Sequence, residues 1–302
     1  MSKMIVFPFW QHEINMARLS IPKLMKSTNK RPKLCENRMV NFKLTDAQLA
    51  RYHADGYLLV DSLFDEEEIE LILRIAKSDQ CLAADAYSRT DGEGGLSRLV
   101  ARNVLEDDIY CAVVRSPRLI DPIEQMLDCE IYHWNHKVMM KEPRVGGAWE
   151  WHQDYGYWYV DHSVLYPLLA SCMIALDPAT KNNGCLQAIR GSHRLGRVEH
   201  VAVNGQMSAD PERVEVALDR MELVYCEMQP GAGLFFDCNL IHRSDRNHSE
   251  NPRWAMICSY NAACNSPFKR LPKTHPAYSR LERCPDERIK QIGRSQLARK
   301  RP

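Results

Sequence analysis

The chain has 302 residues, of which 45% are hydrophobic and 26% are charged, and its formal net charge is +1. This composition is typical of a globular protein with a sizeable core, and no apolar run approaches the 18 or more residues of a membrane span. We therefore expect one large domain with extensions and no membrane partner.

The eleven cysteines are scattered and include no Cys-x-x-Cys pair. This pattern fits neither a disulfide framework nor the usual spacing of a structural zinc site. We interpret them as buried thiols in a reducing compartment, and we expect a cytoplasmic protein.

Positive charge is concentrated at the two ends of the chain. Residues 1–43 carry nine Lys and Arg against two acids, residues 269–302 carry eleven against three, and the part between them carries twenty against thirty-four. An acidic centre is a poor platform for nucleic acid, because affinity for nucleic acid depends on phosphate neutralisation. We therefore predict no nucleic-acid partner, a basic N-terminal extension over 1–43, open to disorder and with Met39 as an alternative start, and a basic tail over 268–302.

The first decisive structural signal begins at Leu44. Thr45 and Gln48 form a capping-box pattern, and Gly56 stands where a helix would end, so we predict a short helix between them. The next apolar run, residues 57–60, predicts a strand.

Two further helices are predicted in the first part of the chain. The segment DEEEIELILRIAKS, residues 65–78, has an acidic first turn that suits the positive end of a helix dipole. Ser116 and Pro117 are typical cap and first-turn residues, and apolar residues then recur at helical spacing through Leu127.

From Glu130 onward the pattern changes to short segments rich in β-branched and aromatic residues, separated by turn clusters such as DPATKNNG and QPGAG. With no helix expected between them, these segments predict an antiparallel sandwich or barrel. The fold class is therefore mainly β with flanking helices (α+β), in a domain spanning 44–267. The expected strands lie within 131–143, 170–177, 184–192, 222–228, 233–244 and 253–261.

His152 and Asp154 carry the first sign of chemistry. They stand two residues apart in GGAWEWHQDYGYWYV, so in a β-strand they would project to the same face. A facial non-haem iron(II) site takes two imidazoles and one carboxylate, and His242, directly after an apolar run, is the best candidate for the third ligand. Arg253 can bind the far carboxylate of a dicarboxylate co-substrate, and Ser244 can add a hydroxyl donor.

These residues, with NNGCLQAIRGSHR at 182–194 between them, closely resemble the phytanoyl-CoA dioxygenase family of iron(II)- and 2-oxoglutarate-dependent oxygenases. The resemblance covers residues 44–266 and includes LTDAQLARYHADGYLLVDSLF at 44–64. It implies a double-stranded β-helix, a jelly-roll or cupin-like barrel, that uses Fe(II), 2-oxoglutarate and O2 to hydroxylate a small-molecule substrate with release of succinate and CO2.

The same resemblance implies a role for each residue at the site. Iron would be bound by His152, Asp154 and His242, and the distal carboxylate of 2-oxoglutarate by Arg253 and Ser244. The residues that flank the co-substrate would be Val138 and Met173. Halogenating relatives are expected to lack the carboxylate ligand, so the presence of Asp154 favours hydroxylation.

The aromatic residues after Asp154 suggest a substrate side. If the strand continues, Gly156 and Trp158 point with the ligands, while Tyr155 and Tyr157 point away. Gly156 would then leave room near the metal, and Trp158 would face the substrate.

Two residues of the 182–194 segment are further substrate candidates. The resemblance places His193 near the pocket, although a turn or capping role is equally open. Arg190 either directs its charge toward the cavity or pairs with an acid.

Four other titratable residues are weaker candidates for a role at the site. His133 and His136 are three residues apart in an expected strand, so we expect them on opposite faces and not as a metal pair. Asp237 and Asp245 are candidates to orient the imidazole of His242.

Two alternatives to an oxygenase use the same ligands: a ligand-binding barrel without turnover, and a zinc-dependent hydrolase. In a zinc hydrolase Arg253 and Ser244 have no evident task. The acidic centre argues against a coenzyme A ester as substrate, so we predict a small metabolite or an amino-acid-like compound.

Overall fold

The computed structural model describes residues 42–79, 84–92, 94–269 and 278–299. Apart from its last two residues, the expected N-terminal extension over 1–43 lies outside these ranges. Within them, no helix combines the length and the apolar character that crossing a membrane requires.

The two ends of helix α1 (Asp46–Asp55) are set by the residues that the sequence singles out. The Thr45 hydroxyl accepts a hydrogen bond from the backbone amide of Gln48, and the Gln48 side chain accepts one from the backbone amide of Thr45. Gly56 ends the helix with a φ of 82°, a left-handed conformation that costs glycine no Cβ strain. The predicted helix is confirmed.

The next predicted elements are also present. Strand β1 (Tyr57–Val60) follows Gly56, and helix α2 (Glu66–Ser78) begins after Asp65, whose carboxylate accepts from the backbone amide of Glu68. Helix α5 (Pro117–Leu127) begins after a serine cap, with proline in its first turn.

In the part of the chain that the structure describes, the strands form two main sheets and a small hairpin, and all their pairs are antiparallel. Among the described residues, no strand pairing joins the large sheet to the smaller one. In spatial order the large sheet contains β1, β11 (Gly233–Asp237), β6 (Leu169–Ala175), β13 (Arg253–Ala262), β4 (Ile131–Lys141), β3 (Leu96–Arg102) and β2 (Tyr87–Thr90), and the smaller sheet contains β10 (Leu223–Cys226), β7 (Leu186–Ile189), β12 (His242–Ser244) and β5 (Trp149–His152).

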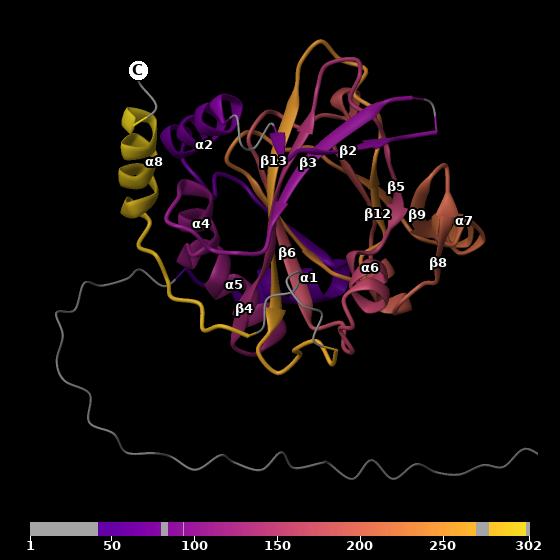
Figure 1. The fold of residues 1–302 in the computed structure, drawn as a ribbon. Helices are drawn as coiled ribbons and strands as arrows, with labels where there is room; N and C mark the ends of the chain where they lie inside the picture. Colours follow the sequence, from indigo (N-terminus) through magenta and orange to yellow (C-terminus); the bar gives the residue numbers. More distant parts are fainter. Residues whose placement is uncertain (1–41, 80–83, 93, 270–277, 300–302) are drawn as a thin grey trace, which may run out of the picture. The chain divides into compact units, whose positions relative to one another are not determined.

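The large sheet has a different cover on each face. Helices α2, α4 (Ile109–Val114) and α5 lie on one side of it (Figure 1), where Ile72 and Ile120 join Ile174 and Met256 of the sheet in one buried cluster. On the other face, Phe236 of β11 packs in a second cluster with Leu186 of the smaller sheet. The chain is thus a mixed α and β fold in which two antiparallel sheets face each other.

Two helices interrupt the region where only strands were expected, so that expectation was wrong. Helix α7 (Pro211–Arg220) carries a usable sequence signal, because Asp210 caps it and proline occupies its first turn. Helix α6 (Asp154–Asp161) has no side-chain cap, and its aromatic composition is as typical of a strand as of a helix. The hairpin of β8 (His200–Val203) and β9 (Gln206–Ala209) was not predicted either.

Helix α8 (Glu287–Arg299) belongs to the segment that was expected to be a basic tail. It packs against α2 and α4, and Ile289 on its inner face is fully buried. The Lys290 ammonium lies 2.6 Å from the Asp65 carboxylate at the start of α2. Part of the C-terminal positive charge is therefore paired with acidic residues of the domain.

A buried ion pair joins α2 to α5. The terminal nitrogens of Arg118 donate to the two carboxylate oxygens of Glu68 over 2.9 and 2.7 Å, and one of them also donates to the backbone carbonyl of Leu63. Glu68 is only 3% exposed, and the Arg118 guanidinium lies 4.2 Å from the centroid of the Phe64 ring. This bidentate geometry is the kind that offsets the cost of burying both charges.

We predict that Arg118→Ala lowers the free energy of unfolding by about 3–5 kcal/mol, because it leaves Glu68 buried without its cation. Denaturant unfolding followed by circular dichroism measures the change. The matched control is Arg74→Ala, which breaks the exposed pair between Arg74 and Glu70 and is expected to cost less than about 1 kcal/mol. Equal losses in the two variants would contradict the prediction.

Candidate active site

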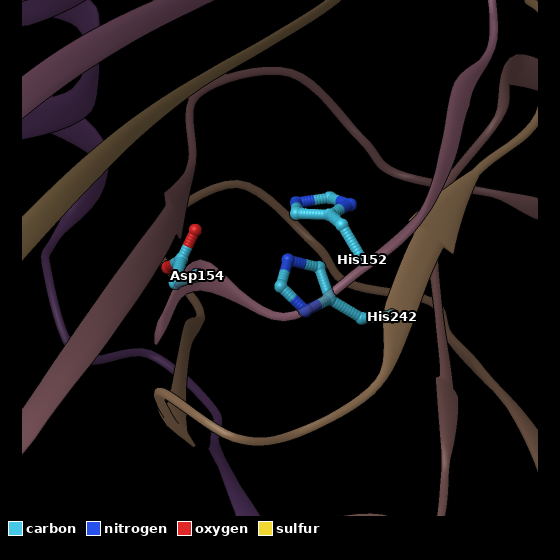
Figure 2. A group of neighbouring side chains, drawn as sticks. All are labelled: His152, Asp154 and His242. Atoms are coloured by element: carbon cyan, nitrogen blue, oxygen red, sulfur yellow. The ribbon is translucent and has the colours of Figure 1, made fainter. Parts of the chain in front are cut away.

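The two histidines expected to bind a metal lie directly opposite each other on neighbouring strands. His152 ends β5, His242 begins β12, and the two are Cα partners in the antiparallel ladder. Their ring centroids are 4.1 Å apart, and Asp154 lies beside them (Figure 2). One ligand atom from each of the three side chains lies within 4.8 Å of the other two. All three are thus within reach of a single metal ion.

Backbone carbonyls fix the orientation of both imidazole rings. Nδ1 of His152 lies 2.7 Å from the carbonyl oxygen of Glu150, and Nδ1 of His242 lies 2.9 Å from that of Leu240. A carbonyl oxygen can only accept, so each Nδ1 carries the proton and each Nε2 keeps its lone pair for a metal. This is the outer hydrogen bond that metal-binding histidines commonly make.

Asp154 reaches the site in a different way from the one expected. It is the first residue of helix α6, not part of a strand, because the extended chain ends at His152. The fully buried Gln153 anchors this junction: its side-chain amide donates to the carbonyls of Gly196 and Asn239 and accepts from the amide of Val198, over 2.7–2.8 Å. The buried Gln153 side chain thus fixes the point at which the helix, and with it the Asp154 carboxylate, begins.

The electrostatic setting favours metal-binding protonation states. Burial lowers the pKa of His152 well below its usual value, and the neighbouring His242 lowers it further. Burial also lowers the pKa of His242, while the Asp154 carboxylate acts in the opposite direction. Both rings are therefore neutral at physiological pH, which is the form that binds metals.

A cavity of about 340 Å³ opens at the three side chains, between the large and the smaller sheet. Strand β4 lines it with alternate residues, among them Lys137 and Met139. Val138 points the other way, into the core under the helices, so the expectation that it flanks the co-substrate is wrong. Met173 of β6 does line the cavity.

Arg253 and Ser244 line the same cavity. Arg253 is 3% exposed, and its Nε is buried without a hydrogen-bond partner among the described residues. Burial lowers the pKa of Arg253 to about 10, so the guanidinium stays charged at neutral pH. Burying a cation without an ion-pair partner costs free energy, and a bound anion would offset that cost. This end of the cavity therefore favours an anionic group.

The aromatic segment after Asp154 contributes through a helical and not a strand geometry. Trp158 lines the cavity as expected, but so does Tyr157, which was expected to point away. Gly156 packs against His200, whose imidazole a Cβ at that position would overlap. Its small size therefore serves contact between α6 and the β8 strand, and not space near the metal.

His193 and Arg190 lie away from the cavity. Nε2 of His193 lies 3.1 Å from the carbonyl oxygen of His53 near the end of α1. Arg190 forms an ion pair with Glu222 at 3.0 Å and approaches the hydroxyl of Tyr57. Both side chains contact other segments of the protein, and neither lines the cavity.

His133 and His136 meet, contrary to expectation. Nε2 of His133 lies 3.1 Å from Nδ1 of His136, and both side chains are buried. The register between β4 and β13 shifts between these positions, and such a bulge brings residues three apart onto one face.

The two acids suggested as partners of His242 have other roles. Asp237 accepts from the backbone amide of Asn239, and Asp245 pairs with Arg243 at 2.6 Å. The imidazole of His242 is oriented by a backbone carbonyl instead.

Several residues of the site escaped sequence reasoning. Lys137 and Arg89 face the cavity, Gln153 anchors Asp154, and Lys141 lies buried behind Ser244. Alternation along the expected strand 131–143 was a usable signal for Lys137. The same alternation places Lys141 on the face of Lys137. The roles of Arg89 and Gln153 depend on contacts between distant segments, which no local pattern reveals.

The family profile described as Phytanoyl-CoA dioxygenase (PhyH) matches residues 52–255 of this chain. Among characterised proteins, L-proline trans-4-hydroxylase from Streptomyces griseoviridis is 32% identical over 247 residues, covering 76% of this chain and 90% of that protein. The ectoine dioxygenase of Bordetella bronchiseptica is 26% identical over 238 residues, covering 74% and 77%.

A solved structure supports the fold. The crystal structure of EctD from S. alaskensis in its apoform has a TM-score of 0.67 and 23% identity, and the match covers 80% of this chain and 87% of that one. At this identity the similarity concerns the arrangement of helices and strands.

We predict that His152→Ala weakens binding of Fe(II) by more than the roughly 10- to 100-fold that loss of an outer hydrogen-bond partner causes, because it removes a direct ligand. Anaerobic titration with Fe(II), or with Co(II) as a spectroscopic probe, measures affinity and stoichiometry. His248→Ala, at an exposed position away from the three ligands, is the control and should bind like wild type. Unchanged affinity in His152→Ala would refute the assigned site.

Proposed function

Because this chain belongs to the phytanoyl-CoA dioxygenase family, we propose that the cavity at His152, Asp154 and His242 is where it hydroxylates a small amino-acid-like substrate. The reaction class is that of an iron(II)- and 2-oxoglutarate-dependent dioxygenase. The observation that carries the proposal is the convergence on one cavity of three metal-binding side chains and a buried arginine whose Nε has no hydrogen-bond partner among the described residues.

The three side chains fit iron(II). Two neutral imidazoles with free Nε2 atoms and one carboxylate form the donor set of non-haem iron oxygenases. When bound, iron(II) with O2 supplies the oxidative decarboxylation of 2-oxoglutarate to succinate and CO2, coupled to insertion of one oxygen atom into a substrate C–H bond. The contribution of the protein is to bind, orient and shield the reactants.

The distal carboxylate of 2-oxoglutarate is assigned to Arg253 and Ser244. Both line the cavity that holds the metal ligands, and a guanidinium can bind a carboxylate through two parallel hydrogen bonds. Met173 is assigned to flank the co-substrate. Phe236 and Leu186, from the apolar cluster between the sheets, form a wall that keeps water from the reacting groups.

The remaining wall suits a substrate that carries both charges. Arg89 and Lys137 offer cations and Asp161 offers an anion, beside the rings of Trp149 and Tyr157. Arg89 lies over the Trp149 ring at 4.7 Å, which orients its charge. A zwitterionic amino acid presents complementary charges, and a cavity of about 340 Å³ is at the small end of ligand sites. The 32% identity to a proline hydroxylase supports the same substrate class.

Two finer points belong to the proposal. The facing sheets are consistent with a double-stranded β-helix, the architecture of cupin-like oxygenases. The nine described cysteines are free thiols, which suits a reducing cytoplasm.

We predict that anaerobically purified protein loaded with Fe(II) converts 2-oxoglutarate to succinate on exposure to O2, and that Arg253→Ala lowers this rate at limiting 2-oxoglutarate by about tenfold or more, because a charged hydrogen-bond partner is lost. Succinate is measured by chromatography. A zinc hydrolase or a binding barrel would produce no succinate, with or without Fe(II), in the wild type and in Arg253→Ala alike.

We predict that a panel of free amino acids, beginning with L-proline, contains a compound that accelerates succinate formation and gains one oxygen atom by mass spectrometry. The amide of the same compound should be a poor substrate, because Arg89 and Lys137 then lack a carboxylate partner. Equal turnover of acid and amide would reject charge recognition at this wall while leaving the reaction class intact.

A further inference from the structure

Lys141 is a buried cation directly behind the cavity. It is the last residue of β4, it is 2% exposed, and it is the Cα partner of Arg253 on β13. Its ammonium donates a hydrogen bond of 2.9 Å to Oγ of Ser244 and another to the backbone carbonyl of Asp245. Lys141 therefore contacts one of the two residues assigned to the co-substrate and lies across the ladder from the other.

Among the described residues, no carboxylate lies within ion-pair distance of Lys141 or Arg253. Asp245 and Asp91 nevertheless act from farther away to raise the pKa of Lys141, and Asp177 acts in the same direction on Arg253. Burial lowers the pKa of Lys141 well below its usual value, and the charge of Arg253 lowers it further. Two buried positive groups on adjacent strands destabilise each other unless an anion binds between or beside them.

Lys141 is held in place at its backbone, at its stem and at its ammonium group. Its stem packs against Gly146, where a Cβ would overlap Cγ of Lys141. The backbone carbonyl of Lys141 accepts from the side-chain amide of Asn247 over 3.3 Å. The ammonium thus has little freedom to move away from Ser244.

We propose that Lys141 is a positioning residue that makes Ser244 a hydrogen-bond donor to the distal carboxylate of the co-substrate. A serine hydroxyl has one proton to donate and two lone pairs. In the charged form, which a bound anion favours, the ammonium of Lys141 can only donate, so it occupies a lone pair of Oγ and leaves the proton of Ser244 for an acceptor in the cavity. The charge of Lys141 adds to that of Arg253 in attracting the same anion.

This inference rests on the proposed function and makes it more specific. Of the assigned anion-binding groups, only Arg253 and Ser244 line the cavity, so Lys141 acts on the ligand through Ser244 and through its charge. It should therefore affect 2-oxo acids that carry a second carboxylate and spare those that lack one. A residue that merely stabilised the fold would affect both alike.

The test measures binding of two 2-oxo acids to the Fe(II)-loaded protein without oxygen, by calorimetry or by the charge-transfer absorption of the complex. We expect Lys141→Met to weaken binding of 2-oxoglutarate by about 10- to 100-fold, the size of a lost hydrogen bond to a charged group. Binding of 2-oxobutanoate, which lacks the distal carboxylate, should change less than about twofold. Fe(II) affinity should be unchanged.

Combining variants separates positioning from general loss of stability. In a Ser244→Ala background, Lys141→Met should weaken 2-oxoglutarate binding less than it does in wild type, because the shared hydroxyl is already absent. Lys141→Gln, which can still donate to Ser244, should retain part of the affinity and serves as a second variant if Lys141→Met does not fold. Lys181→Met, at an exposed lysine, is the matched control.

Equal weakening of both 2-oxo acids, or fully additive effects of Lys141→Met and Ser244→Ala, would overturn the positioning role. So would normal 2-oxoglutarate binding by Lys141→Met. If wild type bound neither 2-oxo acid, the proposed function would fail and this inference with it, and that failure would be visible without any variant.

Discussion

The site depends on the antiparallel pairing of two short strands. Because His242 is the Cα partner of His152, their side chains project to the same face at the spacing of a cross-strand pair. A shift of one residue in this register would turn one imidazole away from the other. Both strands lie in the smaller sheet, where β12 stands between β7 and β5, and the carbonyls of Glu150 and Leu240 orient the rings. Strand pairing thus sets the positions of the two rings, and a carbonyl two residues earlier in the chain sets the tautomer of each.

The carboxylate is supplied by a change of backbone conformation at one residue. The chain is extended up to His152 and helical from Asp154, with Gln153 anchored between distant loops. The third candidate ligand, Asp154, therefore comes from the start of a helix and not from a third strand. It also turns Tyr157 and Trp158 toward the cavity together, which a strand would not do. The helix therefore shapes the wall of the cavity as well as the metal site.

The other end of the cavity is organised by charge. Arg253 and Lys141 face each other across the β13–β4 ladder, both nearly excluded from solvent. Such an arrangement is unfavourable in the empty protein and favourable when an anion is bound, so it favours ligands that carry a carboxylate at this end. The cavity therefore has metal-binding groups at one end and two cationic side chains at the other. This arrangement matches a ligand that chelates a metal with one group and carries a carboxylate at its far end.

Local sequence determined the elements whose signals are local: the capped helices after Thr45 and Ser116, the antiparallel β character after Glu130, and the candidate ligands from their types and spacing. Tertiary structure decided the rest. A bulge in β4 brought His133 to His136, and α6 replaced the expected strand at Asp154. Contacts between distant segments buried Lys141 and Gln153 and drew His193 away from the pocket. Register, bulges and burial are set by packing between segments far apart in the chain, so no local pattern contains them.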